Sequence, residues 1–444
     1  MVSEELNIGL LWIDSLCIVQ DDDDDKASEI TSMPLIYSQA TVTIAASRAR
    51  NVQEGFLQDR PLMGLETADT VFELPFQDSS GNYEIGSVIL LPPTDEVIEP
   101  LDHRGWSMQE RFLSRRILEY GTHQTRWTCH EYMNSNAPAD GFKSTRVYNN
   151  KRSDYLFIRG LEVVMTEADA NRALDPVKFE AHLRFWHHLL RVYTDRSLSL
   201  STDRLPGVSG IAALFAEVLQ DTYYAGLWKS RLATELLWTR SSSSGSKLAM
   251  RPTEYQGPSW SWAGINGSVQ EMILPKSEAA DNDFKVIDCQ IHIRGRAPQP
   301  LKGHFGAVDS AKLIISGRLQ TAELRRETSS LEPVEIQFPR TLSGKLKGIL
   351  AARVTLDCIQ QGPATSSGNP AEVFLLKVIA GPDNARGLVL RRTQQGEYSR
   401  IGTFTLGFGY AAGFESESLD TSRKRYDRDF AWLGRGDLQT ITII

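Results

Sequence analysis

The apolar and polar positions at the start of the chain predict two strands joined by a helix. Residues 10–19 form a nearly continuous apolar run, interrupted only by Asp14 and Ser15, with the length of a buried parallel strand. Five aspartates follow, and aspartate is typical of strand ends and helix caps. Apolar residues then recur at helical spacing from Ser28, and residues 41–46 are β-branched and short. We therefore predict a strand, an acidic loop, a helix and a second strand, which is a βαβ unit.

The pattern changes twice along the rest of the chain. From about residue 150 to 240 it is helical, and Leu183, Trp186 and Leu190 share one face with Phe179. After about residue 266 it becomes strand-like, for example over residues 285–293, 349–356, 373–380 and 403–406. We predict an α+β protein with an N-terminal α/β domain over 1–150, a helical region over 151–265 and a β-rich region over 266–444.

Composition narrows the classes of function. The chain has 444 residues and a net charge of −8, which argues against a general nucleic-acid binder. No apolar run approaches the length of about 20 residues that a membrane span needs, so we expect no membrane span. The four cysteines, at positions 17, 129, 289 and 358, form no CxxC pair. Scattered free thiols are typical of a reducing compartment, and we expect a cytoplasmic protein.

The aspartate run at positions 21–25 has two readings, a metal site and a solvated helix cap. Carboxylate loops that bind Ca²⁺ or Mg²⁺ need alternating ligands and a glycine turn, which this run lacks. His123, Cys129 and His130 are close in sequence, yet a fourth zinc ligand is missing. We therefore predict that the aspartates cap the following helix, and we assign no metal ligands.

Asp14 is the first candidate for chemistry. An acid within an apolar strand costs several kcal/mol when it has no partner. Near the carboxyl end of a parallel strand it would point toward the crevice where α/β proteins bind ligands. A buried ion pair with an arginine is the alternative, and the sequence leaves both open.

The stretch RGWSMQERFL is the second candidate, and it predicts a short helix. On this helix Gln109 falls within the apolar arc, so we expect it to be buried. Glu110 lies beside Trp106 at the edge of the arc, where partial burial would raise the pKa of its carboxyl group. Such a group serves as an acid, a base or an acceptor for sugar hydroxyls. The alternative is an ion pair with a nearby arginine, at position 104, 111 or 115.

Several motifs together resemble a known family. LWIDSLCIVQDD, the spaced residues EI–M–IY–A–TIAAS and RGWSMQERFLSRRILEYG are similar to the heterokaryon-incompatibility (HET) domain of filamentous fungi. DRLPGVSGIA, YAGLW, GPSWSWAG and GEYSRIGTF resemble stretches that follow this domain in many such proteins. The resemblance implies a fungal cytosolic protein of non-self recognition that triggers regulated cell death. It also implies partners, either other fungal incompatibility proteins or further copies of the chain.

The HET domain is in turn similar to TIR domains, which share a flavodoxin-like α/β core. HET domains usually carry a strand and a Y-x-W-G motif well upstream of LWID, so we expect this core to lack its usual first strand. Some TIR domains cleave NAD with a glutamate in a W-C-x-x-E pattern, and WSMQE has the same spacing. The resemblance therefore implies NAD as a candidate substrate and requires no cofactor. It makes Glu110 and Asp14 the candidate catalytic residues. The candidate pocket or ligand-binding residues are Trp12, Arg104, Trp106, Gln109, Trp260 and Trp262.

Two other functions stay open from the sequence. The first is a small-molecule enzyme, such as a cyclase or isomerase of fungal secondary metabolism, with Trp106, Trp127, Trp260 and Trp262 lining an apolar pocket. Packing of these tryptophans in the core is the alternative for that observation. The second is a non-enzymatic recognition module in which residues 266–444 act as the sensor. The sequence does not decide whether the chain is an enzyme at all.

Overall fold

A computed structural model describes residues 2–59, 72–77, 85–90, 98–122, 125–129, 175–241, 249–271, 278–293, 305–326, 334–337, 352–358, 371–382, 384–407 and 419–444. The chain divides into two compact units. The small unit comprises residues 35–163, and the large unit comprises residues 1–34 and 164–444. The predicted division at 150 and 265 stays a prediction, and its first boundary lies outside the described residues.

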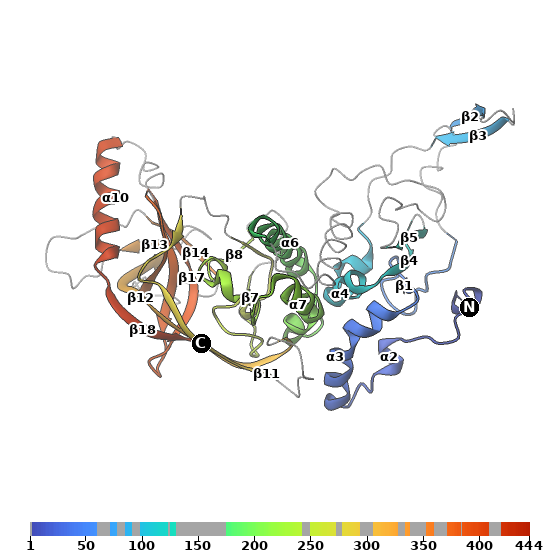
Figure 1. Cartoon of the computed structure of the whole chain (residues 1–444), viewed down its shortest axis with the longest axis horizontal. Coiled ribbons are helices and arrows are strands. Elements are labelled where there is room, and N and C mark those ends of the chain that lie inside the picture. The colour runs from blue at the N-terminus through green and yellow to red at the C-terminus, as the bar shows by residue number, and fades with distance from the viewer. Residues whose placement is uncertain are drawn as a thin grey trace. The chain divides into compact units, whose positions relative to one another are not determined.

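The small unit is built around a three-stranded mixed sheet in the order β1-β4-β5. Strand β1 (Thr43–Ala45) pairs in parallel with β4 (Arg116–Tyr120), which pairs antiparallel with β5 (Thr125–Cys129). Helix α4 (Gly105–Leu113) precedes β4 and follows a 3-10 turn, Pro100–His103. Strands β2 (Phe72–Gln77) and β3 (Ile85–Leu90) form a separate two-stranded ribbon (Figure 1).

The acidic run caps the helix after it, as predicted, but the helix begins within the run rather than at Ser28. Helix α3 extends from Asp23 to Gln39, and it contains Pro34. One carboxylate oxygen of Asp22 accepts hydrogen bonds from the backbone N–H groups of Asp24 and Asp25, at 2.9 and 3.1 Å. Asp22 therefore caps the helix, and the following acids lie where the helix dipole favours negative charge.

The predicted strand over residues 10–19 is wrong. Residues 10–13 have no regular structure, and a single helical turn, α2 (Asp14–Cys17), follows them. Leu10 and Leu16 are 90% and 79% exposed. A strand exists only where a neighbouring strand takes its backbone hydrogen bonds, and no described strand pairs with this run. The predicted βαβ unit therefore fails at its first strand, and the flavodoxin-like core stays a prediction.

The helical region of the large unit follows the predicted periodicity. Helix α6 (Pro176–Asp195) begins after Asp175, whose carboxylate accepts from the backbone N–H groups of residues 177 and 178. Its face formed by Leu183, Trp186 and Leu190 is buried, as predicted. Helix α7 (Pro206–Leu219) lies beside α6 (Figure 1).

Short elements complete the helical region. They are the 3-10 turns Ser201–Arg204, Lys229–Arg231 and Trp262–Gly264, helix α8 (Leu232–Glu235), and the strand pairs β6–β7 (Tyr223–Tyr224 with Leu227–Trp228) and β8–β9 (Thr239–Arg240 with Val269–Gln270). At the N-terminal end of the chain, α1 spans Val2–Glu5.

The described strands from residue 279 onward form a nine-stranded sheet. Its strands are β10 (Ala279–Ala280), β11 (Lys285–Ile293), β12 (Val308–Arg326), β13 (Val334–Gln337), β14 (Ala352–Leu356), β15 (Ala371–Ala380), β16 (Asn384–Arg392), β17 (Tyr398–Gly407) and β18 (Asp437–Ile443). The long strand β12 pairs with β11, β13, β15 and β18, so it organises the sheet.

Helix α10 (Leu419–Gly434) lies along this sheet (Figure 1). Its Trp432 and Leu433 enter an apolar cluster with residues such as Val373 and Phe404 from the strands. The chain is thus an α+β protein, as predicted. No helix in the described ranges combines the length and the apolar character that a membrane crossing requires.

Candidate functional site

The predicted helix RGWSMQERFL is helix α4, and its two sides differ. Ser107, Met108, Gln109, Phe112 and Leu113 are buried, and Gln109 is only 1% exposed, as predicted. Trp106 and Glu110 stand one helical turn apart and are partly exposed. The side of α4 that carries Trp106 and Glu110 is therefore accessible, whereas the opposite side is fixed in the core.

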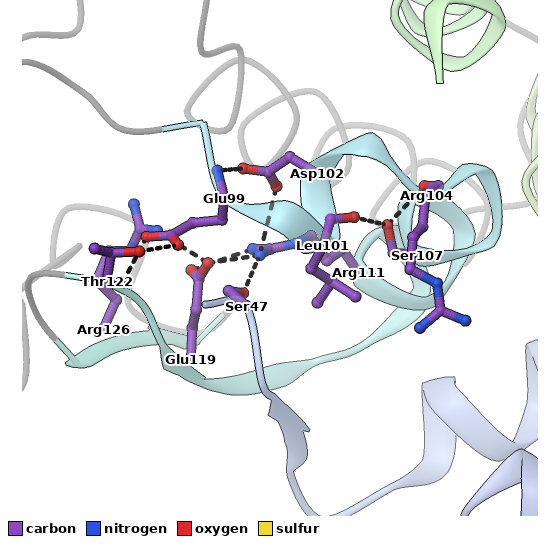
Figure 2. A network of polar contacts seen from close by, with 10 residues as sticks. All are labelled: Ser47, Glu99, Leu101, Asp102, Arg104, Ser107, Arg111, Glu119, Thr122 and Arg126. Atoms are coloured by element: carbon purple, nitrogen blue, oxygen red, sulfur yellow. Dashed lines mark hydrogen bonds and ion pairs between the residues drawn. The ribbon is translucent and has the colours of Figure 1, made fainter. Parts of the chain in front are cut away.

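The start of α4 is held by local hydrogen bonds. The Ser107 hydroxyl lies 2.7 Å from the carbonyl oxygen of Leu101 and 2.8 Å from that of Arg104 (Figure 2). Arg104 occupies the N-cap position and is exposed. At the other end, Ser114 donates from its hydroxyl to the carbonyl oxygen of Glu110, at 2.7 Å. Both ends of the short helix are thereby defined.

Arg111, the residue after Glu110, connects α4 to a buried ionic network. Its guanidinium donates to both carboxylate oxygens of Glu119 on β4, at 2.6 and 3.2 Å, and to the hydroxyl of Ser47, at 2.9 Å (Figure 2). Asp102 lies 3.7 Å from the same guanidinium. A bidentate arginine–carboxylate pair fixes both distance and orientation, so α4 is held against β4 and against the segment after β1.

The network extends further at two places, at Glu119 and at Asp102, which accepts from the backbone N–H of Glu99 at 3.1 Å. Arg126 on β5 lies 2.9 Å from a Glu119 oxygen. The buried carboxylate of Glu99 accepts from the backbone N–H and the hydroxyl of Thr122, at 2.8 and 2.7 Å. Figure 2 shows these contacts as one continuous set. Helix α4, two strands and two loops are therefore held together by directional contacts.

The electrostatics of the network oppose proton transfer by Glu119. Burial alone would raise the pKa of this carboxyl group, but the positive charges of Arg111 and Arg126, with hydrogen bonds from Arg111 and Ser47, hold the pKa well below its ordinary range. Glu119 is thus a fixed anion. It positions α4, and the partly exposed Glu110 remains the candidate for chemistry on that helix.

The sequence prediction missed this network. It considered Arg111 only as a partner of Glu110, whereas the structure pairs Arg111 with Glu119 and Asp102. A signal was present in RILEY, because strand alternation places Glu119 on the same face as the buried Ile117. An acid on the buried face of a strand requires a cationic partner.

Asp14 and Trp12 lie in the large unit, and Glu110 lies in the small unit. Asp14 is the first residue of α2 and is exposed, and its carboxylate accepts from the backbone N–H of Ser15, at 2.8 Å. The buried strand position predicted for Asp14 is therefore wrong. Trp12 is partly exposed. Catalytic and binding roles for these two residues stay predictions.

Arg400, within the stretch GEYSRIGTF, is 0% exposed. Its guanidinium donates to both carboxylate oxygens of Asp357, at 2.9 and 3.0 Å, and to the carbonyl oxygens of Leu236 and Trp238, each at 2.6 Å. It also lies 3.6 Å from the centre of the Trp238 ring. Arg400 thus joins strand β17 to the residue just after β14 and to the helical region.

Trp260 and Trp262, two of the predicted pocket residues, are 0% and 1% exposed. Trp262 donates from Nε1 to the carbonyl oxygen of Gly226, at 2.8 Å, and Trp238 donates from Nε1 to the carbonyl oxygen of Trp260, at 2.9 Å. Gly226 has φ of +109°, and a side chain there would meet the Trp262 ring. This packing favours the core alternative for both tryptophans, and a ligand-binding role stays a prediction.

His187 on α6 bridges two acids. Its Nε2 lies 2.5 Å from a carboxylate oxygen of Glu235 on α8, and its Nδ1 contacts the carboxylate of Glu271, just after β9. Burial alone would lower the pKa of His187, but the two carboxylates raise it to about 10. The neighbouring His188 and Arg191 lie on α6 itself, at 3.2 Å from each other. His187 is therefore a cation that links α6 to α8 and β9.

We predict that His187 makes the large unit less stable as the pH rises above neutrality. A folded-state pKa raised from 6.5 to about 10 contributes stability fully below pH 6.5 and loses it progressively toward pH 10. We expect a loss of about 1–2 kcal/mol in the free energy of unfolding between pH 6.5 and 8. Urea denaturation of the wild type and of His187→Gln, across this range, measures the effect. A His187→Gln protein with the same pH slope as the wild type would contradict it.

The described residues define an α+β protein with two compact units. In the small unit an ionic network joins helix α4 to the mixed sheet, and the large unit contains helices and a nine-stranded sheet. Residues 1–110 match the family model described as heterokaryon incompatibility protein (HET). The match ends at Glu110 of α4, and it confirms the resemblance that the motifs indicated. No curated protein and no solved structure matches the chain.

Proposed function

We propose that this chain is a cytoplasmic protein of fungal non-self recognition that triggers regulated cell death. The observation that carries the proposal is the HET match over residues 1–110, which links the chain to heterokaryon incompatibility. The matched residues include most of α4, the helix that carries Trp106 and Glu110. Other fungal incompatibility proteins, or further copies of this chain, are the partners that the proposal expects.

Two routes to cell death remain within this proposal, self-association and cleavage of NAD. The accessible side of α4 supports the second route, since Glu110 and Trp106 lie one turn apart there and the opposite side is buried. Water would displace nicotinamide at the ribose carbon, breaking the glycosidic bond and releasing nicotinamide and ADP-ribose. Glu110 would accept hydrogen bonds from the ribose hydroxyls and stabilise the cationic transition state. NAD is the substrate here, as in similar TIR domains, and no cofactor is needed.

Glu110→Ala provides the test of the catalytic route. We expect the wild type to reduce the viability of a fungal host and to consume NAD when purified. We expect Glu110→Ala to consume NAD at least about 100-fold more slowly, because the transition state loses its anionic partner. The measurements are colony survival and NAD loss. Glu110 is partly exposed, so the variant should keep the thermal unfolding temperature of the wild type within a few degrees.

Glu254→Ala is the matched control, because Glu254 is an exposed glutamate of the large unit. We expect it to behave as the wild type in both assays. A folded Glu110→Ala protein that still kills the host would overturn the catalytic route and leave self-association. A wild type that does not affect viability would overturn the proposed function itself.

The alternatives from the sequence receive less support. Of the tryptophans that motivated a small-molecule enzyme, Trp106 and Trp127 belong to the small unit, and Trp260 and Trp262 belong to the large unit. The last two are in the core, and their burial is what weakens this alternative. The nine-stranded sheet is compatible with a recognition module. A pull-down of fungal proteins with the full chain tests that alternative, and the absence of any bound protein would count against it.

A further inference from the structure

An apolar run near the start of the chain is exposed. Leu10, Leu11, Leu16 and Val19 are 90%, 58%, 79% and 51% exposed. Single exposed apolar side chains are ordinary on protein surfaces, but a contiguous apolar stretch marks an interaction site. The run contains one helical turn, α2, and no residue of that turn is buried. Four large apolar side chains within residues 10–19 are therefore mostly exposed to solvent.

Strand β1 is an edge strand in the sheet of the small unit. Strand β1 pairs with β4 on one side, and no described strand pairs with its other side. Such an edge leaves backbone N–H and C=O groups that a further strand can bind. Short β-branched strands of this type accept an added strand readily, because the new backbone hydrogen bonds do not depend on particular side chains.

Charge determines the direction in which the segment fits. Asp21 to Asp25 follow the apolar run, and Arg48 and Arg50 follow β1 after Ala45. In a parallel pairing the carboxyl ends of both strands lie together, so the aspartates would meet the two arginines. In an antiparallel pairing, the uncharged residues at the start of the run would lie beside Arg48 and Arg50 instead. Charge complementarity therefore favours the parallel arrangement.

We propose that residues 10–19 of one copy of this chain add, as a parallel strand, to the β1 edge of a second copy. When each copy gives its own segment and receives the other, the dimer closes with two-fold symmetry and both exposed runs become buried. The single turn α2 must unwind, which costs little for an isolated four-residue helix. This dimer would be the associated form in the self-association route of the proposed function. Its link to cell death rests on that proposed function, whereas the strand pairing itself does not.

The first experiment measures the oligomeric state of the full chain by sedimentation over a range of concentrations. We expect the wild type to dimerise, and the double variant Leu10→Asp, Leu16→Asp to weaken dimerisation by about 100-fold or more, because two charges would enter an apolar contact. Both leucines are exposed in the single chain, so the variant should fold. Val177→Asp is the matched control, since Val177 is 77% exposed at the start of α6.

The second experiment tests the pairing itself. One tagged copy keeps Cys17, which is exposed, and a differently tagged copy carries Cys17→Ser and Arg48→Cys. We expect oxidation to join the two tags through a disulfide between positions 17 and 48, and the Cys17→Ser copies alone should not form this link. A copy that carries both cysteines, oxidised at high dilution, should stay without an internal link between these positions.

Three results would overturn the inference: a wild type that stays monomeric at high concentration, a dimer unaffected by Leu10→Asp, Leu16→Asp, or an internal link between positions 17 and 48 of one chain. The proposed function fails separately. A monomeric protein that still kills the fungal host would remove the inference and keep the function, whereas a strand-exchanged dimer without effect on viability would do the reverse.

Discussion

Asp357→Asn is expected to lower the free energy of unfolding of the large unit by about 3–5 kcal/mol. The substitution keeps the shape of the side chain but removes its charge, and it leaves Arg400 as a fully buried cation. Burial already lowers the pKa of Arg400, and the charge of Asp357 is the main force that opposes this shift. Urea denaturation followed by tryptophan fluorescence measures the loss, because Trp238 lies directly against the guanidinium.

The ion pair between Lys312 and Glu397 provides the control for this prediction. Its atoms lie 2.7 Å apart, but the lysine side chain is 51% exposed. Glu397→Gln should therefore cost no more than about 1 kcal/mol, since solvent screens an exposed pair. If Asp357→Asn and Glu397→Gln lowered the free energy of unfolding equally, the prediction would be wrong. The burial of Arg400 would then not make the charge of Asp357 more important than that of an exposed partner.

Glu119→Gln is expected to have the second largest effect, a loss of about 3 kcal/mol in the stability of the small unit at pH 7. Glu119 accepts from Arg111 and Arg126 at once, so the substitution leaves two partly buried cations without their common anion. We expect hydrogen exchange of β4 and β5 to accelerate by about 100-fold. Asp59→Asn, at an exposed acid of the same unit, should leave this exchange unchanged.

The same residue predicts how stability depends on pH. The folded-state pKa of Glu119 is depressed, so its contribution is present above the unfolded value of about 4.3 and is lost progressively as the pH falls below it. The difference between the wild type and Glu119→Gln should therefore shrink between pH 4.5 and 3. A difference that stays constant over this range would mean that Glu119 does not act through its charge.

The success of the sequence predictions depended on how local the relevant forces are. Helical periodicity identified the buried face of α6 and the burial of Gln109 in α4, because neighbours three and four residues apart on a helix are set by the sequence. The acidic run was correctly assigned as a cap, since capping involves residues a few positions apart. The apolar run at 10–19 was wrongly assigned as a buried strand, because a strand requires a partner distant in sequence.

For the candidate site, too, the sequence predicted the local features but not the contacts between distant residues. The sequence singled out Glu110 and Trp106 from their spacing, and their partial exposure is compatible with the proposed role. It did not find Glu119 as the partner of Arg111, because that contact depends on how α4 packs on β4. Likewise, nothing in GEYSRIGTF by itself indicated that Arg400 reaches Asp357, 43 residues earlier.

The sequence by itself determined the HET resemblance, the α+β class, the periodic helices and the capped start of α3, since these depend on short-range patterns. Only the tertiary structure decided which charges are neutralised in the core, at Glu119 and Arg400, and which apolar residues stay uncovered, at 10–19. The physical reason is that burial and ion pairing depend on the pairing of strands and the packing of helices. Those contacts join residues that are far apart in the chain, and the identity of each residue alone does not specify its partner.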